Sequence, residues 1–223
     1  MGDFRAYLVP RDKDEAEKII GNVAKDGSVD YLLSPLTMTG NGIVFPYTPI
    51  ISGAGGKASY ELKSFTHSIY PSPIYQYSSV NNIVLSADFT AQTRDDARYI
   101  LAVIRFCSIT TKMSFGKYTS STFGRGTPPP ILKFRYLGRH MYDDVPVVME
   151  SFNYELPKTV DYVGVNVKAR TENNVVDEVT YVPTKLTLML TLIPFYNPYS
   201  ISNTFSMDDF INGRLTDGTG GYM

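Results

Sequence analysis

The side chains that could bind a metal or attack a substrate are few and widely separated in this 223-residue sequence. The two histidines, His67 and His140, stand in neither an H-x-x-x-H nor an H-E-x-x-H context, so we expect no metal site. The single cysteine, Cys107, falls within an amphipathic pattern, which favours a buried and inert thiol over a nucleophile. We therefore expect no metal and no cofactor.

Three pairs of adjacent aspartates are the remaining candidates for acid–base chemistry. Asp95–Asp96 and Asp208–Asp209 fall where helices are expected to begin, and there carboxylates accept hydrogen bonds from free N–H groups. Asp143–Asp144 lies in an expected turn before a strand. The stretch GAGGKAS, 53–59, lacks the spacing of a phosphate-binding loop. Because no set of residues converges on a catalytic centre, the sequence predicts a protein that is not an enzyme.

Composition narrows the remaining classes of protein. The formal net charge is −1, so no basic field indicates a nucleic-acid partner. One cysteine allows no intrachain disulfide, and no apolar run approaches the roughly 18 residues of a membrane span. We expect a soluble protein made in a reducing cytosol. The 17 tyrosines suit surfaces that become half-buried between subunits, although strands also favour tyrosine.

One strand and the helix after it are the clearest elements. Four residues alternate onto one face of the strand: Ile83, Leu85, Ala87 and Phe89. The next segment predicts a long amphipathic helix with Thr93 as its N-cap, Asp96 as the capping-box partner and an end at Gly116. A strand that leads into such a helix indicates a sheet with one covered face.

Further strands are predicted along the rest of the chain. A strand at 42–51 contains Pro46 and Pro49, so it is expected at a sheet edge, paired with the alternating segment 57–70 as a hairpin. The polar segment 164–180 is expected to form a hairpin that projects from the domain. Other strands are predicted at about 131–137, 145–155 and 184–194.

These elements indicate an α+β fold that is mainly antiparallel β. We expect an N-terminal arm over 1–40 with a short helix near 12–25, a β domain over 41–195, and a C-terminal part over 196–223. The C-terminal part is expected to hold a short helix at 206–212 and a glycine-rich tail.

Five segments, taken in order, resemble a known family. They are GNGIVFPYTPII (40–51), THSIYPSPIYQYSSVNNIVLSADFTAQTRDDARYILAVIRFCSITTKMSFG (66–116), GTPPPILKFRYLG (126–138), YDDVPVVMESFNYELPKTVDYV (142–163) and VPTKLTLMLTLIP (182–194). Together they resemble the tail-tube initiator and tube-cap proteins in the baseplates of T4-type contractile-tailed bacteriophages. The resemblance covers about 40–194 and is weaker at both ends of the chain.

The resemblance implies a tail-tube-like β-sandwich or barrel domain flanked by one amphipathic helix. It implies a hexameric ring on the central baseplate hub, with sheets joined edge to edge around a channel. The expected partners are other copies of the chain, the hub protein, and a tail-tube or second initiator ring. DNA is expected to pass through the lumen without specific binding. The expected location is the virion, at the tail baseplate, after assembly in the host cytoplasm.

Candidate contact residues lie in three irregular or projecting segments. They are Phe45, Tyr47 and Pro49 on the expected edge strand, Thr127, Pro128, Pro129 and Pro130 in the stiff loop, and Lys168, Arg170 and Glu172 on the expected hairpin. The polyproline segment fixes either a contact between subunits or the next strand within its own subunit, and the sequence favours neither.

Other functions remain as alternatives. The chain could be the major tail-tube protein or another adaptor ring, which copy number per particle would distinguish. It could also be a baseplate-associated cell-wall hydrolase, which would need a carboxylate pair in a cleft. A ligand-binding β domain would show a closed apolar pocket instead of open apolar edges.

Overall fold

The computed structural model describes residues 5–20, 32–53, 55–113, 126–170, 175–216 and 222–223. In chain order its elements are β1 (Tyr7–Pro10), α1 (Lys13–Ile20), α2 (Ser34–Thr37), β2 (Ile43–Val44), β3 (Ile50–Ser52), β4 (Gly56–Lys63), β5 (Ser72–Val80), β6 (Ile83–Thr90), α3 (Arg94–Thr110), β7 (Leu132–Tyr136), β8 (Tyr142–Glu155), β9 (Tyr162–Arg170), β10 (Val175–Pro183), β11 (Lys185–Pro194), α4 (Pro198–Thr204), α5 (Met207–Ile211) and the short 3-10 helix η1 (Arg214–Thr216).

The main sheet has seven strands in the order β2-β1-β7-β8-β11-β6-β3, and every neighbouring pair is antiparallel. This confirms the predicted α+β, mainly antiparallel class. The strand predicted at 42–51 is divided by its prolines into β2 and β3, which occupy the two opposite edges of the sheet. The edge position is therefore confirmed, because proline cannot supply the N–H that an interior strand needs.

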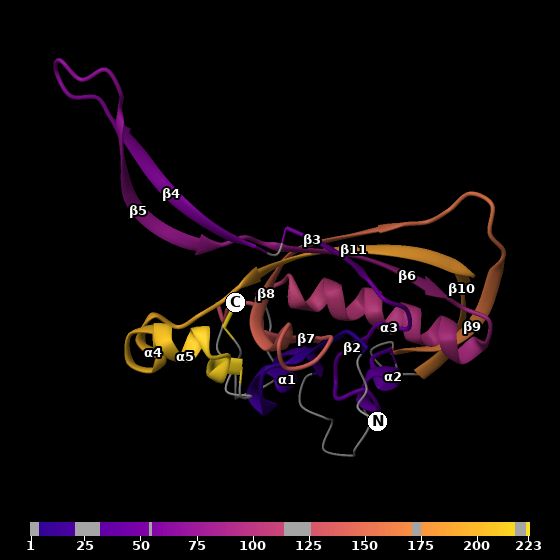
Figure 1. Ribbon diagram of the computed structural model, residues 1–223. Coiled ribbons are helices and arrows are strands. Elements are labelled where there is room, and N and C mark those ends of the chain that lie inside the picture. Colours follow the sequence, from indigo (N-terminus) through magenta and orange to yellow (C-terminus); the bar gives the residue numbers. More distant parts are fainter. Residues whose placement is uncertain (1–4, 21–31, 54, 114–125, 171–174, 217–221) are drawn as a thin grey trace.

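The sheet curls around α3, so that both of its ends approach the same helix. Figure 1 shows β11 and β6 above α3, with β7 and β2 below it. Tyr99 of α3 reaches the edge strand β2, because its hydroxyl accepts from the Val44 N–H at 2.7 Å and donates to the Val44 carbonyl at 2.8 Å. From the other end of the sheet, β6 also packs on α3. The helix thus fills the concave side of the sheet.

Helix α3 begins as predicted. Thr93 is the N-cap, and a complete capping box joins its hydroxyl to the Asp96 N–H and the Asp96 carboxylate to the Thr93 N–H. These bonds from Thr93 hold the pKa of the Asp96 carboxyl below its usual value. The helix ends at Thr110, before the expected Gly116, and the Thr110 hydroxyl donates back to the Phe106 carbonyl. Gly116 lies outside the described residues.

The buried faces of β6 and β11 agree with their alternation in sequence. Ile83, Leu85, Ala87 and Phe89 are all buried, as are Leu186, Leu188, Leu190 and Leu192, and the two strands are paired along their length. These residues form one continuous core with α3. Two-residue periodicity predicted this part of the fold because one face of each strand is buried.

The N-terminal segment differs from the arm expected over 1–40. β1 lies inside the main sheet, between β2 and β7, and Leu8 is fully buried. α1 lies within the helix expected near 12–25. The carboxylate of Glu15 in α1 accepts from the Ile131 N–H at 3.1 Å, and the Ile131 carbonyl accepts from the Arg11 N–H at 3.0 Å. The end of the polyproline segment is therefore fixed within its own subunit, where β7 begins.

The hairpin expected to project over 164–180 is present as β9–β10, but it does not project from the domain. Its strands pair along their whole length, and both pack against α3. Val165 and Val182 are buried in the core. The hairpin folds back because these inward valines cover a side of α3 that the main sheet leaves open. Its turn residues lie outside the described residues.

Candidate assembly surface

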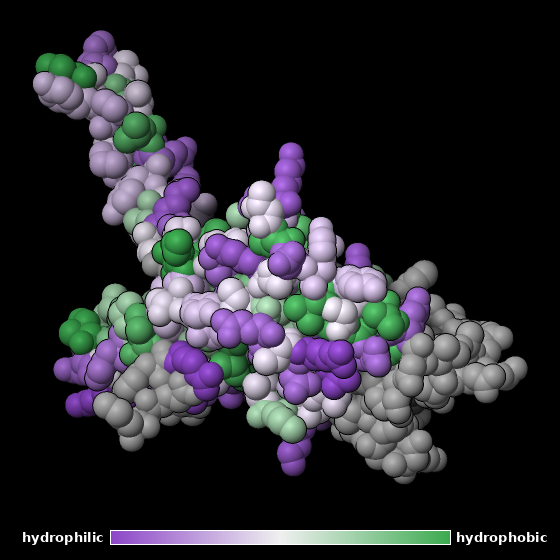
Figure 2. All heavy atoms as spheres, turned by 90° about the vertical axis from the view of Figure 1, so that its right-hand side faces the viewer, coloured by the Kyte–Doolittle hydropathy of each residue, from purple (hydrophilic) through white to green (hydrophobic). Residues whose placement is uncertain are grey.

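A different hairpin leaves the body of the molecule. β4 and β5, together the β4–β5 ribbon (Gly56–Val80), form a separate two-stranded sheet. Figure 1 shows the ribbon extending beyond β3 and away from α3. Figure 2, turned by 90°, also shows it standing clear of the body with apolar and polar residues mixed along it. The predicted pairing of 42–51 with 57–70 is wrong, because β4 pairs with β5 and β3 pairs with β6.

A glycine-rich junction lets the ribbon leave the sheet. Gly53 has φ +82°, and a Cβ there would lie 2.7 Å from the Asn82 carbonyl oxygen, so only glycine fits without strain. The Asn81 N–H donates to the Gly55 carbonyl at 2.8 Å, which holds the two strands together just beyond the junction. The ribbon therefore continues the β3–β6 pair in a new direction.

The side chains of the ribbon are exposed although many are apolar. Tyr60 is 57% exposed, Leu62 is 66% exposed, and Ile69 near the tip is 87% exposed. Other exposed apolar residues of the ribbon and its tip are Phe65, Tyr70, Ile74, Tyr75 and Tyr77. An isolated two-stranded hairpin is only marginally stable in water. Several large exposed apolar side chains on one projecting element are typical of an interaction site.

Local contacts shape the ribbon without burying it. The rings of Tyr60 and Tyr75 meet edge to face with centroids 5.8 Å apart, and Gln76 donates to the Glu61 carboxylate at 3.0 Å across the strands. At the tip, the Ser68 N–H donates to the Phe65 carbonyl at 3.0 Å. These contacts set the cross-strand register, whereas burial of the aromatic rings requires a partner molecule.

The contact residues predicted from the sequence do not all lie at the surface. Phe45 is fully buried and packs on Phe89, and Pro49 is also buried, so both are core residues of the subunit and not surface contacts. Tyr47 is exposed, with its hydroxyl 2.8 Å from the Thr90 hydroxyl.

The other candidates lie in the polyproline segment and on β9. Pro128 is exposed, Thr127 and Pro129 are half-buried, and Pro130 is buried. Lys168 and Arg170 lie in β9, and Glu172 lies outside the described residues. The ribbon was missed as a contact because 57–70 was paired with the wrong strand. The alternation of Tyr60 and Leu62 with charged residues could have indicated a two-sided exposed ribbon.

Cys107 and the Asp143–Asp144 pair, which were considered for chemistry, have structural roles. Cys107 is fully buried, and burial raises the pKa of its thiol to about 12. The Arg135 guanidinium donates to the Asp144 carboxylate at 2.6 Å and lies 3.6 Å from Asp143. Within the described ranges, no group of three or more His, Cys, Asp or Glu side chains is arranged to hold a metal ion.

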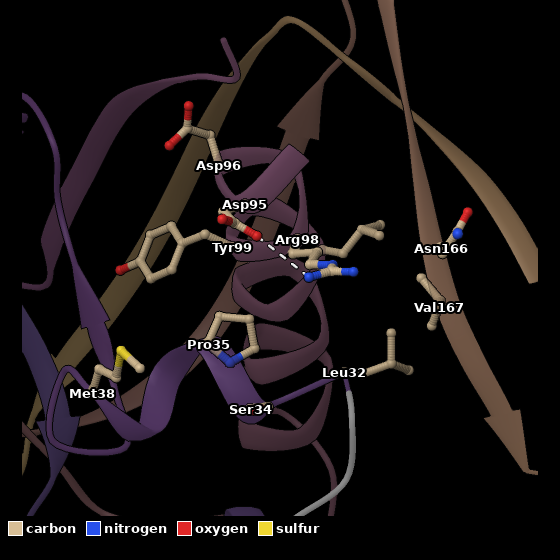
Figure 3. Close-up of a pocket in the computed structure, with 11 residues that line it drawn as sticks. Leu32, Ser34, Pro35, Met38, Asp95, Asp96, Arg98, Tyr99, Asn166 and Val167 are labelled. Atoms are coloured by element: carbon tan, nitrogen blue, oxygen red, sulfur yellow. Dashed lines mark hydrogen bonds and ion pairs between the residues drawn. The ribbon is translucent and has the colours of Figure 1, made fainter. Parts of the chain in front are cut away.

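A hollow of about 830 Å³ lies between α2, the start of α3 and β9. Figure 3 shows Asp95 and Arg98 turned toward each other on the α3 wall of the hollow, joined by an ion pair of 3.3 Å. Asp96 is committed to the helix cap and Tyr99 to Val44. The four polar side chains that α3 contributes to the hollow are therefore already bonded to one another or to the backbone.

Comparisons with known proteins add no relative. The scan against protein-family models found no match to the chain. The search of curated proteins likewise found no match. No helix among the described residues is both long enough and apolar enough to cross a bilayer.

Proposed function

We propose that this protein is a structural component of a phage baseplate that forms a ring on the central hub and initiates polymerisation of the tail tube. The proposal rests on the ordered resemblance over about 40–194 and on one structural observation, the exposed β4–β5 ribbon. Burying one large apolar side chain stabilises an assembly by about 1.5–3 kcal/mol. Tyr60, Leu62 and the tip residues can therefore contribute substantially to association between subunits.

The mechanism proposed is templating. A preformed ring presents strand borders and loops in the symmetry that the next ring requires, so the tube subunits need not nucleate unaided. The proposed partners are five further copies of the chain, the hub protein, and a tail-tube or second initiator ring. DNA passes through the lumen without specific binding, and the assembled ring belongs to the virion.

The test begins with the purified full chain. Mass photometry and electron microscopy are expected to show six-membered rings, alone or on the hub protein. Tail-tube subunits of the same virus are then expected to polymerise from these rings faster than without them. The matched control replaces Gly56–Val80 with a short Gly-Ser linker, which removes no core residue and should leave a folded but unassembled body.

Two results would contradict the proposal. One is a chain that stays monomeric at all concentrations and binds neither hub nor tube subunits. The other is a count of many rings per virus particle, which would identify the major tail-tube protein instead. A single ring per particle agrees with the initiator.

A further inference from the structure

In the described part of the chain, each strand of the ribbon has one edge that pairs with no neighbouring strand, which is called its free border. The free border of β4 is more regular than that of β5. β5 contains Pro73, which has no N–H to donate, and the cross-strand register passes from Tyr77 to Tyr75, so that Gln76 is an extra residue. β4 contains neither proline nor an extra residue. Proline and bulges are the usual means of protecting a strand border from pairing. The unprotected border of the ribbon is therefore that of β4.

A second unpaired border lies on the outer half of β8, in which Glu150 is an extra residue where the register against β11 shifts. β8 pairs with β11 as far as Glu155, but its pairing with β7 extends only over Tyr142–Val147. Among the described residues, no strand pairs with the other side of Met149–Glu155. In the row β8-β11-β6-β3 this border lies at one end, and β3, from which β4 continues, lies at the other.

The two borders match in the chemistry of both faces. Along β4, Ala58, Tyr60 and Leu62 lie on one face, and the residues between them, including Ser59 and Glu61, lie on the other. Along β8, Phe152 and Tyr154 lie on one face with stacked rings, and Ser151, Asn153 and Glu155 lie on the other. Phe152 is half-buried and Tyr154 is 47% exposed. Strands paired side by side therefore place aromatic beside aromatic and polar beside polar.

The charges at the two borders also have opposite sign. β4 carries exposed lysines at both ends, Lys57 and Lys63. The outer half of β8 carries exposed Glu155 and exposed Glu150, whose carboxylate also accepts from the Asn82 side chain at 2.9 Å. Exposed ion pairs add little affinity, but opposite charges at a border favour the correct partner and register.

We propose that the β4 border of one copy pairs with Met149–Glu155 of β8 in a second copy. The proposal rests on the proposed ring and names the surfaces that close it. The two borders are unlike, because one lies on the ribbon beyond β3 and the other on the outer half of β8, so the contact is head-to-tail, and repeated rotation closes it into a ring. Main-chain hydrogen bonds supply the pairing, and the packing of Tyr60 and Leu62 beside Phe152 and Tyr154 supplies burial.

Cysteine crosslinking tests the pairing directly. S59C and N153C place thiols on the polar faces of the two strands, and the native thiol of Cys107 is buried. A mixture of the two variants, oxidised under conditions where oligomers form, is expected to give a covalent dimer. The S59C/N153C double variant is expected to give a ladder up to the full ring. The matched control is S79C. Ser79 lies on β5, opposite Lys57 and on the same face of the ribbon as Ser59, and S79C should not crosslink to N153C.

Dissociation constants provide a second readout. The double variant Y60S/L62S is expected to weaken self-association by about tenfold or more, because it removes the packing that the β8 aromatics would receive. Y77S alters an equally exposed tyrosine on the opposite face of the ribbon and is expected to change the constant by less than about threefold. Near-equal changes in the dissociation constant would contradict the inference that the face with Tyr60 and Leu62 packs beside the β8 aromatics.

The outcomes separate this inference from the proposed function. Rings in which S59C and N153C do not crosslink overturn the pairing but leave a tube initiator possible. Crosslinking of S59C to itself, or of S79C as readily as S59C, also overturns it, because the ribbon would then meet another ribbon or use β5. Crosslinked rings that fail to start tubes support the pairing and contradict the initiator.

Discussion

The ring of Phe45, which directly follows the edge strand β2, lies 5.9 Å from the ring of Phe89 in β6. In the order of the sheet, β1, β7, β8 and β11 stand between these two strands. The sheet therefore bends until its two ends meet through side chains, with Tyr99 of α3 bonded to the backbone beside them. The core of the body therefore closes without any residue of the ribbon.

Replacing Phe45 with alanine is expected to destabilise the folded chain by about 3–5 kcal/mol, because Phe45 is fully buried at this closure and leaves a cavity. Urea unfolding followed by circular dichroism measures the change. The control M38A alters a residue that is 95% exposed and should lie within about 0.5 kcal/mol of wild type. A small effect of F45A would show that the two ends of the sheet are not held together by this contact.

Removing the Tyr99 hydroxyl tests how the edge strand β2 is held. Tyr99→Phe leaves both the N–H and the carbonyl of Val44 without their partner, so a loss of about 1–3 kcal/mol is expected. The control is Tyr75→Phe on the ribbon, whose hydroxyl bonds only to the exposed Ser78 hydroxyl. Equal stability of both variants would mean that the bonds to Val44 do not hold β2 on the helix.

Asp88 gives a prediction about pH. The Thr187 hydroxyl, and then the Lys185 ammonium at 3.0 Å, hold the pKa of this carboxyl below its usual value. The contribution to stability is therefore present above about pH 4 and is lost as pH falls through the lower folded pKa. Asp88→Asn should be less stable than wild type at pH 7, and the difference should disappear at strongly acid pH.

Thr187→Val isolates the larger cause of that shift. When the Thr187 hydroxyl is removed, the pKa of Asp88 measured by NMR should rise toward its value in an unfolded chain. An unchanged pKa in this variant would assign the shift to Lys185 instead.

Cys107 is expected to be unreactive in the folded chain. Burial raises its pKa to about 12, so little thiolate exists at pH 8 and the reagent has no access. Ellman's reagent should label the thiol only after denaturation, with one equivalent released per chain. Rapid labelling of the native protein would contradict the position of Cys107 in the core.

Sequence reasoning succeeded where the signal was local. The capping box at Thr93, the alternation along β6 and β11, and the short helix α5 with Ser206 as its N-cap all follow from neighbouring residues, and all are present. Each involves a hydrogen bond or a burial periodicity that spans only a few positions.

It failed where the answer depended on distant pairing. The segment 57–70 alternates as a strand should, but alternation does not state which strand lies beside it. β9–β10 was expected to project because its centre is polar, whereas Val165 and Val182 pack it onto α3. Phe45 and Pro49 were expected at the surface because the curl of the sheet, which buries them, has no signature in a single strand.

No residue of the ribbon, Gly56–Val80, belongs to the core cluster. The sequence of the ribbon is therefore not constrained by the packing of the body. Substitutions in the ribbon are expected to leave the melting temperature of the body nearly unchanged. The ribbon can therefore tolerate natural variation while the fold of the body is preserved, and a protein engineer can exchange this segment as a module.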